Sequence, residues 1–238
     1  MAGHSKWSTI KRKKGKTDAG RAKVFSKVGR EISVAVRESG SDPKANSKLR
    51  EAIAKAKALN VPSDNIERAI KKADTDKTEY EQILYEGYGP CGVALMVNCL
   101  TDNRNRTAGD LRHYFDKYGG NLGQSGCVGF LFERKGILML ERHGQDEAKI
   151  MEDCLDAGAL DFEIDEDEVE VITQPEDAYA TGETMEQKGY TVTFAGAEYI
   201  PSTRVKLDEE NIARMEKLLE LLDDNDDVQA LWHNWEEA

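Results

Sequence analysis

Apolar residues in the first third of the chain repeat at a helical spacing. Between about residues 17 and 40 they recur every three or four positions, so at roughly 100° per residue they share one face. These residues are Phe25, Val28, Ile32 and Val36. Residues 42–43 (Asp-Pro), or Asn46 slightly later, are typical of the start of a second helix, and residues 62–63 (Pro-Ser) of a third. The pattern predicts a three-helix module over residues 17–80.

Beyond a polar stretch at residues 74–81, strands alternate with helices. Residues 92–100 carry apolar side chains at alternate positions and predict a strand, and residues 128–132 predict a second. Between them, a Thr-x-x-Asp sequence at residues 107–110 predicts the cap of a helix that ends at a Gly-Gly pair.

A second α/β unit is predicted to begin at Lys135. Its elements follow in the order β-α-β-β-α-β, which is a ferredoxin-like arrangement. The expected strands are 137–140, 162–164, 169–172 and 190–195, the last running on toward 200, and the expected helices are 145–157 and 175–188. A helix over 208–222 and a strand over 228–232 come after Pro201 and lack a local partner, so we expect them to complete the first α/β unit.

We therefore predict an α+β fold in which an N-terminal three-helix module is followed by two ferredoxin-like α/β domains, the second inserted into the first. Residues 1–80 would form a basic arm and a helical nucleic-acid-binding domain. Residues 81–134 together with 207–238 would form a discontinuous α/β domain. Residues 135–206 would form the inserted, acidic ferredoxin-like domain.

Charge is unevenly distributed along this plan. The whole chain has a formal charge of −12 at pH 7, yet residues 1–30 contain ten Lys or Arg and one acid, Asp18. Residues 1–80 carry a net +10 and the remaining 158 residues carry −22. A dense cluster of cations in an acidic chain favours a polyanionic partner, and nucleic acid is the commonest soluble polyanion.

These cations occur in two settings. Residues 1–16 offer little apolar surface and are predicted to form a flexible arm, in which Trp7 could stack on an unpaired base. The first helix then places a row of cations opposite its apolar face, a row that Arg37 extends. The predicted nucleic-acid contacts are Lys6, Trp7, Lys11, Arg12, Lys13, Lys14, Lys16, Arg21, Lys23, Lys27 and Arg30. The alternative is a solvated helix face and a floppy terminus that bind nothing.

The helical module shows no clear base-reading helix. Its second helix is rich in Ala and Lys and lacks the cluster of Asn, Gln and Arg expected of a face that reads base edges. The cations there suit phosphate better than bases. The sequence thus supports affinity for nucleic acid more than sequence specificity.

Catalytic and metal-binding motifs are not recognised in the sequence. Residues 87–92 match G-x-G-x-x-G, but Pro90 interrupts the match and a β-type run follows, so a tight turn is favoured over a nucleotide site. The four Cys and four His are scattered. The acidic run at residues 161–170 alternates in the manner of an amphipathic hairpin. We expect no enzyme activity, no cofactor, no metal and no small-molecule substrate.

Four stretches resemble one known family. They are MAGHSKW at 1–7, KRKKGKTDAGRAKVFSK at 11–27, YEGYGP at 85–90 and TDNRNRTAGDLRHYFDKYGGNLG at 101–123. On these stretches, and over essentially its whole length, the chain resembles the YebC family. Members are labelled as transcriptional regulatory proteins, and the mitochondrial branch is a translational activator of cytochrome c oxidase. The resemblance implies a three-domain architecture and a role in gene expression.

One of these stretches, residues 101–123, contains two segments with further candidate contacts. Arg104 and Arg106 lie just before the predicted helix start and could grip phosphate there, although a polar capping loop is an equal alternative. The glycine-rich loop at 119–126 could let backbone approach a partner, or could simply connect helix and strand. Because the resemblance makes both segments family motifs, Arg104, Arg106, Asn121 and Gly123 are added to the predicted contacts.

The sequence therefore predicts a non-catalytic, nucleic-acid-binding regulator of gene expression. The first hypothesis is a DNA-binding transcriptional regulator of the YebC type. The alternative is a ribosome-associated translation factor that binds rRNA or tRNA near the peptidyl-transfer region through the basic arm. A pure protein scaffold would leave the N-terminal charge unexplained. The longest apolar run, residues 93–97, is too short to cross a bilayer, and no apolar signal region opens the chain, so we expect a cytoplasmic protein that does not contact membranes.

Overall fold

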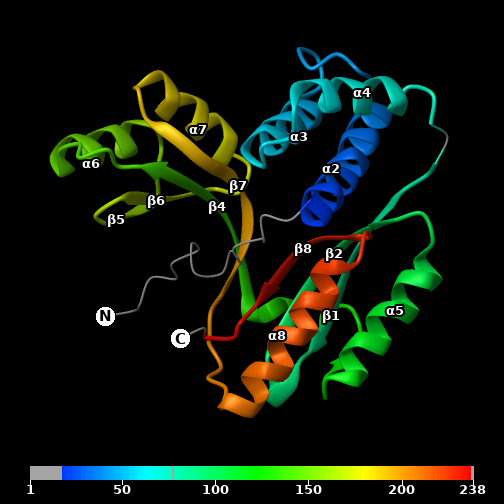
Figure 1. Cartoon of the computed structure of the whole chain (residues 1–238). Helices are drawn as coiled ribbons and strands as arrows, with labels where there is room; N and C mark the ends of the chain where they lie inside the picture. The colour runs from blue at the N-terminus through cyan, green and yellow to red at the C-terminus, as the bar shows by residue number, and fades with distance from the viewer. Residues whose placement is uncertain (1–17, 77, 237–238) are drawn as a thin grey trace. The chain divides into compact units, whose positions relative to one another are not determined.

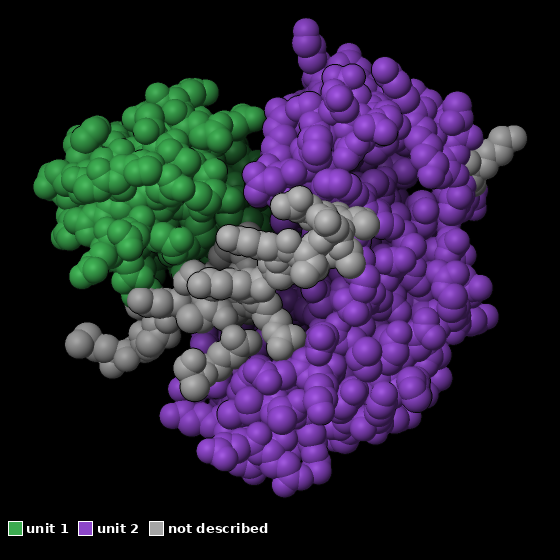
Figure 2. Space-filling view, in the orientation of Figure 1, with its two compact units in different colours: residues 1–12, 133–200 green, residues 13–132, 201–238 purple. Residues whose placement is uncertain are grey.

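Figures 1 and 2 show a computed structural model of the chain, in which residues 18–76 and 78–236 are described. Among these residues there are seven α-helices and two four-stranded sheets, so the predicted α+β class is confirmed. The described residues form two compact units: one consists of residues 133–200, and the other of residues 18–132 and 201–236.

Three helices open the larger unit, as predicted. They are α2 (Asp18–Ser39), α3 (Ser47–Ala58) and α4 (Ser63–Ala73). The apolar face predicted for α2 forms their shared core, because Val28, Ile32 and Val36 are buried against Leu49 of α3 and Phe25 packs beside them. The periodicity of the sequence is thus satisfied by packing among the three helices.

Asn46 caps α3, and the structure thereby decides between the two predicted starts. Its side-chain oxygen accepts a hydrogen bond from the Leu49 N–H at 3.0 Å. Its amide nitrogen donates to the carbonyls of Ala35 and Gly40, both at 2.7 Å. Because Asn46 is buried, these three bonds also join the end of α2 to the start of α3.

The same unit contains a discontinuous sheet with the strand order β3-β1-β2-β8. Its strands are β1 (Glu81–Tyr88), β2 (Ala94–Thr101), β3 (Asn121–Leu122) and β8 (Val228–His233), and its helices are α5 (Arg104–Lys117) and α8 (Glu209–Asp224). All three pairings are antiparallel. Alternate residues of β2, including Leu95 and Val97, pack with Phe115 of α5 and Leu218 of α8, so both helices cover one face. The C-terminal helix and strand do return to this sheet, as expected.

The sequence analysis misses one element in this region and misplaces two others. The pattern did not predict β1, because its apolar residues are consecutive rather than alternating. The predicted cap at residues 107–110 is wrong: the N-cap of α5 lies four residues earlier, at Asn103, whose side chain accepts a hydrogen bond from the Arg106 N–H at 3.1 Å. The strand predicted at residues 128–132 is also wrong, since Gly129–Leu131 is a short 3₁₀ turn and the next strand begins only at Phe132.

Residues 133–200 form the smaller unit. Its elements are β4 (Phe132–Glu141), α6 (Glu147–Asp156), β5 (Asp161–Ile164), β6 (Glu168–Thr173), α7 (Ala178–Gln187) and β7 (Thr191–Pro201). The strand order β5-β6-β4-β7 is that of a ferredoxin-like fold. The first sheet has a different order, so the two sheets are not copies of one topology.

The smaller unit is inserted between two neighbouring points of the larger one. At the junction, the Ser202 N–H donates to the carbonyl of Leu131 at 2.8 Å, which holds the two ends of the insertion side by side. The smaller unit spans residues 133–200, whereas the predicted insertion spans residues 135–206. Division of the larger unit into a helical domain and a discontinuous α/β domain remains our proposal.

Candidate nucleic-acid interface

The residues predicted to bind nucleic acid fall into two groups. The arm residues Lys6, Trp7, Lys11, Arg12, Lys13, Lys14 and Lys16 lie outside the described residues, and so does the side chain of Arg21. The remaining candidates are described: three cations of α2, two arginines of α5, and Asn121 and Gly123 in the loop after α5. Nucleic-acid binding by either group stays a prediction.

The cationic row of α2, which we define as Lys23, Lys27, Arg30 and Arg37, is not an open face. At its start, Lys23 pairs with Asp224 at 2.7 Å. One turn further on, Lys27 donates to the backbone carbonyl of Asp223 at 2.7 Å and lies 3.4 Å from its carboxylate. Lys27 is only 6% exposed. Lys27 is therefore not part of a solvated helix face, which was the alternative that the sequence left open.

Arg30 continues the same contact. Its guanidinium donates to the carboxylate of Asp227 at 2.5 Å and to the carbonyl of Leu100 at 3.1 Å. It also lies 5.6 Å from the centre of the Tyr80 ring, at cation–π distance. At the end of the row, Arg37 donates to the backbone carbonyl of Thr78 at 2.6 Å. Every member of the row thus has a partner within the larger unit.

Asp227 is the centre of this network. Besides Arg30, its carboxylate accepts hydrogen bonds from Arg106 at 2.9 and 3.2 Å, from Thr107 at 2.7 Å and from Thr101 at 3.2 Å. Burial of the carboxylate favours its neutral form, but the hydrogen bonds from Thr107, Arg106 and Arg30 outweigh burial and lower the pKa of Asp227. The side chain is consequently ionised at neutral pH and joins α2, β2 and α5.

Arg104 and Arg106 differ in accessibility. Both lie in the first turn of α5, not before it. Arg106 donates to Asp102 at 2.8 Å and to Asp227, and these two carboxylates raise its pKa. Arg104 is 66% exposed, and its nearest acid is Glu81 at 3.5 Å. Of the two, Arg104 has the geometry of a residue that a phosphate can reach.

The side chain of Glu86 anchors the end of the glycine-rich loop that follows α5 (residues 119–126) and the residues directly after it. This buried carboxylate accepts the backbone N–H groups of Gly126, Val128 and Gly129 at 2.7, 2.8 and 2.7 Å. Burial would raise the pKa of Glu86, but these three hydrogen bonds prevail and lower it. One side chain that the sequence did not single out therefore anchors three backbone amides at the end of the loop.

The two loop candidates have different surroundings. The N–H of Gly123 donates to the carbonyl of Glu86 at 2.8 Å, and a Cβ at position 123 would lie 2.4 Å from the sulfur of Cys127. Close packing against Cys127 is thus sufficient reason for glycine there. Asn121 pairs with Tyr88 through the backbone of β3 and is exposed. Its side chain is open to a partner.

Other cations of the helical region are exposed on α3, on α4 and in the turn before α3. They are Lys44, Lys48, Arg50, Lys57, Arg68, Lys71 and Lys72. Some have intramolecular partners: Lys48 pairs with Glu38, and Arg50 donates to the carbonyls of Pro43 and Lys44. These contacts are on the surface, where ion pairs are weak and readily exchanged for a phosphate.

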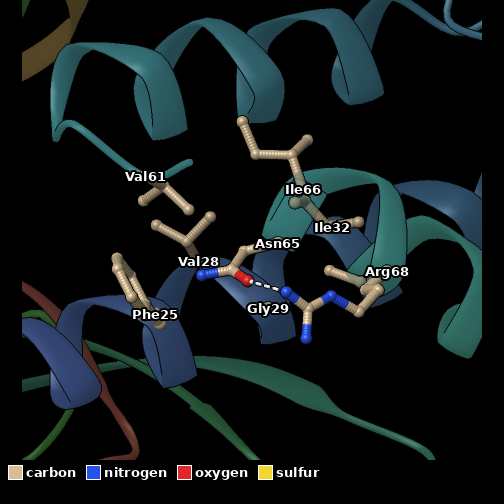
Figure 3. Close-up of a pocket in the computed structure, with 9 residues that line it drawn as sticks. Phe25, Val28, Gly29, Ile32, Val61, Asn65, Ile66 and Arg68 are labelled. Atoms are coloured by element: carbon tan, nitrogen blue, oxygen red, sulfur yellow. Dashed lines mark hydrogen bonds between the residues drawn. The ribbon is translucent and has the colours of Figure 1, made fainter. Parts of the chain in front are cut away.

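An apolar groove of about 260 Å³ lies between α2 and α4. Phe25, Val28 and Val61 are among the residues that line it, and Figure 3 shows Asn65 and Arg68 meeting beside it. The guanidinium of Arg68 donates to the side-chain oxygen of Asn65 at 2.7 Å. The groove offers apolar contact and one hydrogen-bonding pair.

Membrane spans and metal sites are both absent from the part of the chain that the structure describes. None of the described helices has the length and apolar character needed to span a bilayer. Among the same residues, no group of three or more His, Cys, Asp or Glu side chains is arranged to hold a metal ion.

The described structure consists of three helices followed by two α/β units, one of which is inserted in the chain of the other. A family model described as the TACO1/YebC protein N-terminal domain matches residues 5–76, and one described as the TACO1/YebC second and third domain matches residues 80–235. The chain therefore belongs to the TACO1/YebC family, which confirms the resemblance noted from the sequence.

Individual relatives match along the whole chain. A protein of Finegoldia magna is 55% identical over 239 residues, covering 99% of each chain. One of Ruminiclostridium cellulolyticum is 55% identical over 241 residues, covering all of this chain and 97% of the relative. Both carry the name "Probable transcriptional regulatory protein". The crystal structure of a conserved hypothetical protein from Aquifex aeolicus superposes with a TM-score of 0.83 at 45% identity, over 98% of this chain and 97% of that one.

Proposed function

We propose that this chain is a nucleic-acid-binding regulator of gene expression that contacts phosphate through its basic N-terminal arm. The observation that carries the proposal is the segregation of charge: residues 1–30 hold ten cations and one acid, in a chain of net charge −12. Such a segment attracts a polyanion, while the acidic remainder repels it and so orients the molecule. The names of the relatives support a role in transcription, for which we propose DNA as the target.

The structure supports one refinement of this interface. Because the cationic row of α2 is paired with acids of the same unit, the arm must supply most of the initial contacts. Arg104 and the exposed cations of α3 and α4 are available to extend them. Contacts of this kind neutralise phosphates and carry no information about base sequence.

A ribosomal target is the second candidate. It is favoured by the composition of α3 (SKLREAIAKAKA), whose polar positions carry Lys, Arg, Ser and Glu but neither Asn nor Gln, the residues that pair with adenine. A protein that recognises phosphate and shape is well suited to structured RNA. In this reading the protein acts as a translational activator that binds rRNA or tRNA near the peptidyl-transfer region. We propose that in both readings the protein is cytoplasmic and acts by binding and not by catalysis.

Competition between the two targets separates these candidates. A labelled DNA duplex is titrated with the full-length protein by fluorescence anisotropy at several salt concentrations, with purified ribosomes as competitor. Tight binding with a marked preference for one duplex sequence supports the transcriptional reading. Saturable ribosome binding that survives an excess of duplex supports the ribosomal one. If the protein binds neither target, the proposed function is refuted.

The role of the arm has its own test. Replacing Lys11, Arg12, Lys13 and Lys14 by Ala is expected to weaken binding and to flatten the plot of log K against log salt by about 0.9 for each duplex phosphate that the arm no longer neutralises. The matched control changes the three lysines to Arg, which keeps the charge and should keep the slope. An unchanged slope in the Ala variant would exclude the arm from the interface.

A further inference from the structure

An acidic turn at the end of α8 faces the cationic row of α2. We define this acidic turn as residues 223–227, in which four of five side chains are Asp. Asp224, Asp223 and Asp227 contact Lys23, Lys27 and Arg30, respectively. A predicted nucleic-acid surface is thus occupied by anions of the same chain.

Three cations of the row lie in line along α2, an arrangement that suits the binding of anions. Positions 23, 27 and 30 follow the i, i+4, i+7 spacing and lie on one face, over about 10 Å along the helix axis at 1.5 Å per residue. Their nitrogens approach carboxylate oxygens at 2.7, 3.4 and 2.5 Å. Carboxylate and phosphate oxygens are alternative partners for the same Lys and Arg donors, so a row that fits one also fits the other.

The solvent exposure of this contact decreases from its outer end, at Lys23, to its inner end, at Arg30. The outer pair is open to solvent, because the side chain of Lys23 is 39% exposed and that of Asp224 is 59% exposed. Exposed pairs of this type are weak and are screened by salt. At the inner end, the Asp227 side chain is 4% exposed and is held by Arg30, Arg106 and two threonines. The outer end can separate while the inner end stays joined.

We propose that the acidic turn is a built-in competitor of nucleic acid for the cationic row of α2. A phosphodiester backbone drawn in by the arm displaces Asp224 and binds Lys23 in its place, while Lys27 keeps its bond to the backbone carbonyl of Asp223 and Arg30 stays paired with Asp227. The inference rests on the proposed function and adds an autoinhibitory contact to it. Its consequence is that binding to the row requires a ligand that can outcompete the turn.

The test is a double substitution in the turn, Asp223→Asn with Asp224→Asn, in the full-length protein. The matched control is Glu209→Gln with Glu210→Gln, at the other end of the same helix and about 20 Å away. Both variants remove two negative charges, so any general charge effect is shared. Binding of a labelled DNA duplex and of a single-stranded RNA is measured between about 50 and 200 mM salt, the range over which phosphate contacts change affinity most visibly.

The turn variant is expected to bind at low salt at least about tenfold more tightly than the control. On the duplex, its slope of log K against log salt should be steeper by about 0.9, the increment for one released cation, Lys23. Adding Lys23→Gln to the turn variant should abolish the gain. Asp224→Lys, a change at an exposed position, is a second way to open the outer end and should act in the same direction.

Equal affinity and slope in the turn variant and the control would overturn the inference, and so would a gain that persists without Lys23. Both results leave the proposed function intact, provided that the wild-type protein binds. Absence of binding by the wild-type protein and by every variant would instead refute the proposed function, and the inference with it. Circular dichroism of each variant verifies that the folded state is retained.

Discussion

Removing the charge of Asp227 should strongly destabilise the larger unit, although the substitution barely changes the shape of the side chain. The change Asp227→Asn keeps the shape of the side chain but leaves Arg30 and Arg106 without their shared carboxylate. Breaking one partner of a buried pair costs about 3–5 kcal/mol. Arg106 is 46% exposed and Asn can still bond to the two threonines, so the lower end of that range applies, about 3 kcal/mol.

The assay is thermal and urea unfolding followed by circular dichroism. For a chain of this size, each kcal/mol shifts Tm by about 2–4 °C, so a decrease of about 6–12 °C is expected. The control is Asp226→Asn, one residue earlier in the same acidic turn and exposed, which should change stability by less than about 0.5 kcal/mol. If the two variants unfold together, Asp227 does not hold the network as described.

The pH dependence gives an independent reading of the same group. Because the folded pKa of Asp227 lies below its ordinary value of 3.8, the carboxylate contributes stability above that value and loses it as pH falls through the folded pKa. The difference in stability between wild type and Asp227→Asn should therefore be constant from about pH 8 to 5 and shrink below about pH 4. A difference that persists unchanged into strong acid would contradict the assigned ion pairs.

Three further predictions concern single residues. Glu86→Gln should cost about 1–3 kcal/mol and speed hydrogen exchange at the three loop amides it accepts, with a wild-type advantage that disappears as pH falls below about 4. Asn46→Ala should cost about 1–2 kcal/mol, detectable in urea unfolding, because α3 loses its cap and two carbonyls lose a donor. In a thiol-titration experiment at about pH 8, exposed Cys91 should react at once, whereas Cys99 and Cys154 should react only on unfolding, because burial raises their pKa to about 12 and about 11. Fast reaction of all three thiols would show that the sheet and α6 open readily.

How far the sequence predicted the fold depends on the range of the interactions involved. The core face of α2 was predictable, because Val28 and Ile32 follow a local period that any helix must satisfy. Strand β1 was not, because consecutive apolar residues in a polar stretch give no period and only pairing with β2 defines the strand. Tertiary pairing, and not local propensity, decides such elements.

The candidate site was predicted in composition but not in its pairing. The cations of α2 are visible in the sequence, yet the partner of Lys27 lies 196 residues away at Asp223. A run of four Asp in five positions is typical of solvated charge until the fold brings it to the helix. Arg104 and Arg106 look equivalent along the chain, and only Asp227 distinguishes them, since it binds the second and leaves the first exposed.

The hydrogen bond between Ser202 and Leu131 has a consequence for how the smaller unit is carried. Two chain ends that already touch need almost no linker, so the loop-closure entropy of joining residue 131 directly to residue 202 is small. We therefore expect that the smaller unit can be deleted without unfolding the larger one. A shortened chain that omits residues 132–201 should still form the β3-β1-β2-β8 sheet. Comparing it with the full-length protein would then show what the smaller unit contributes to the whole protein.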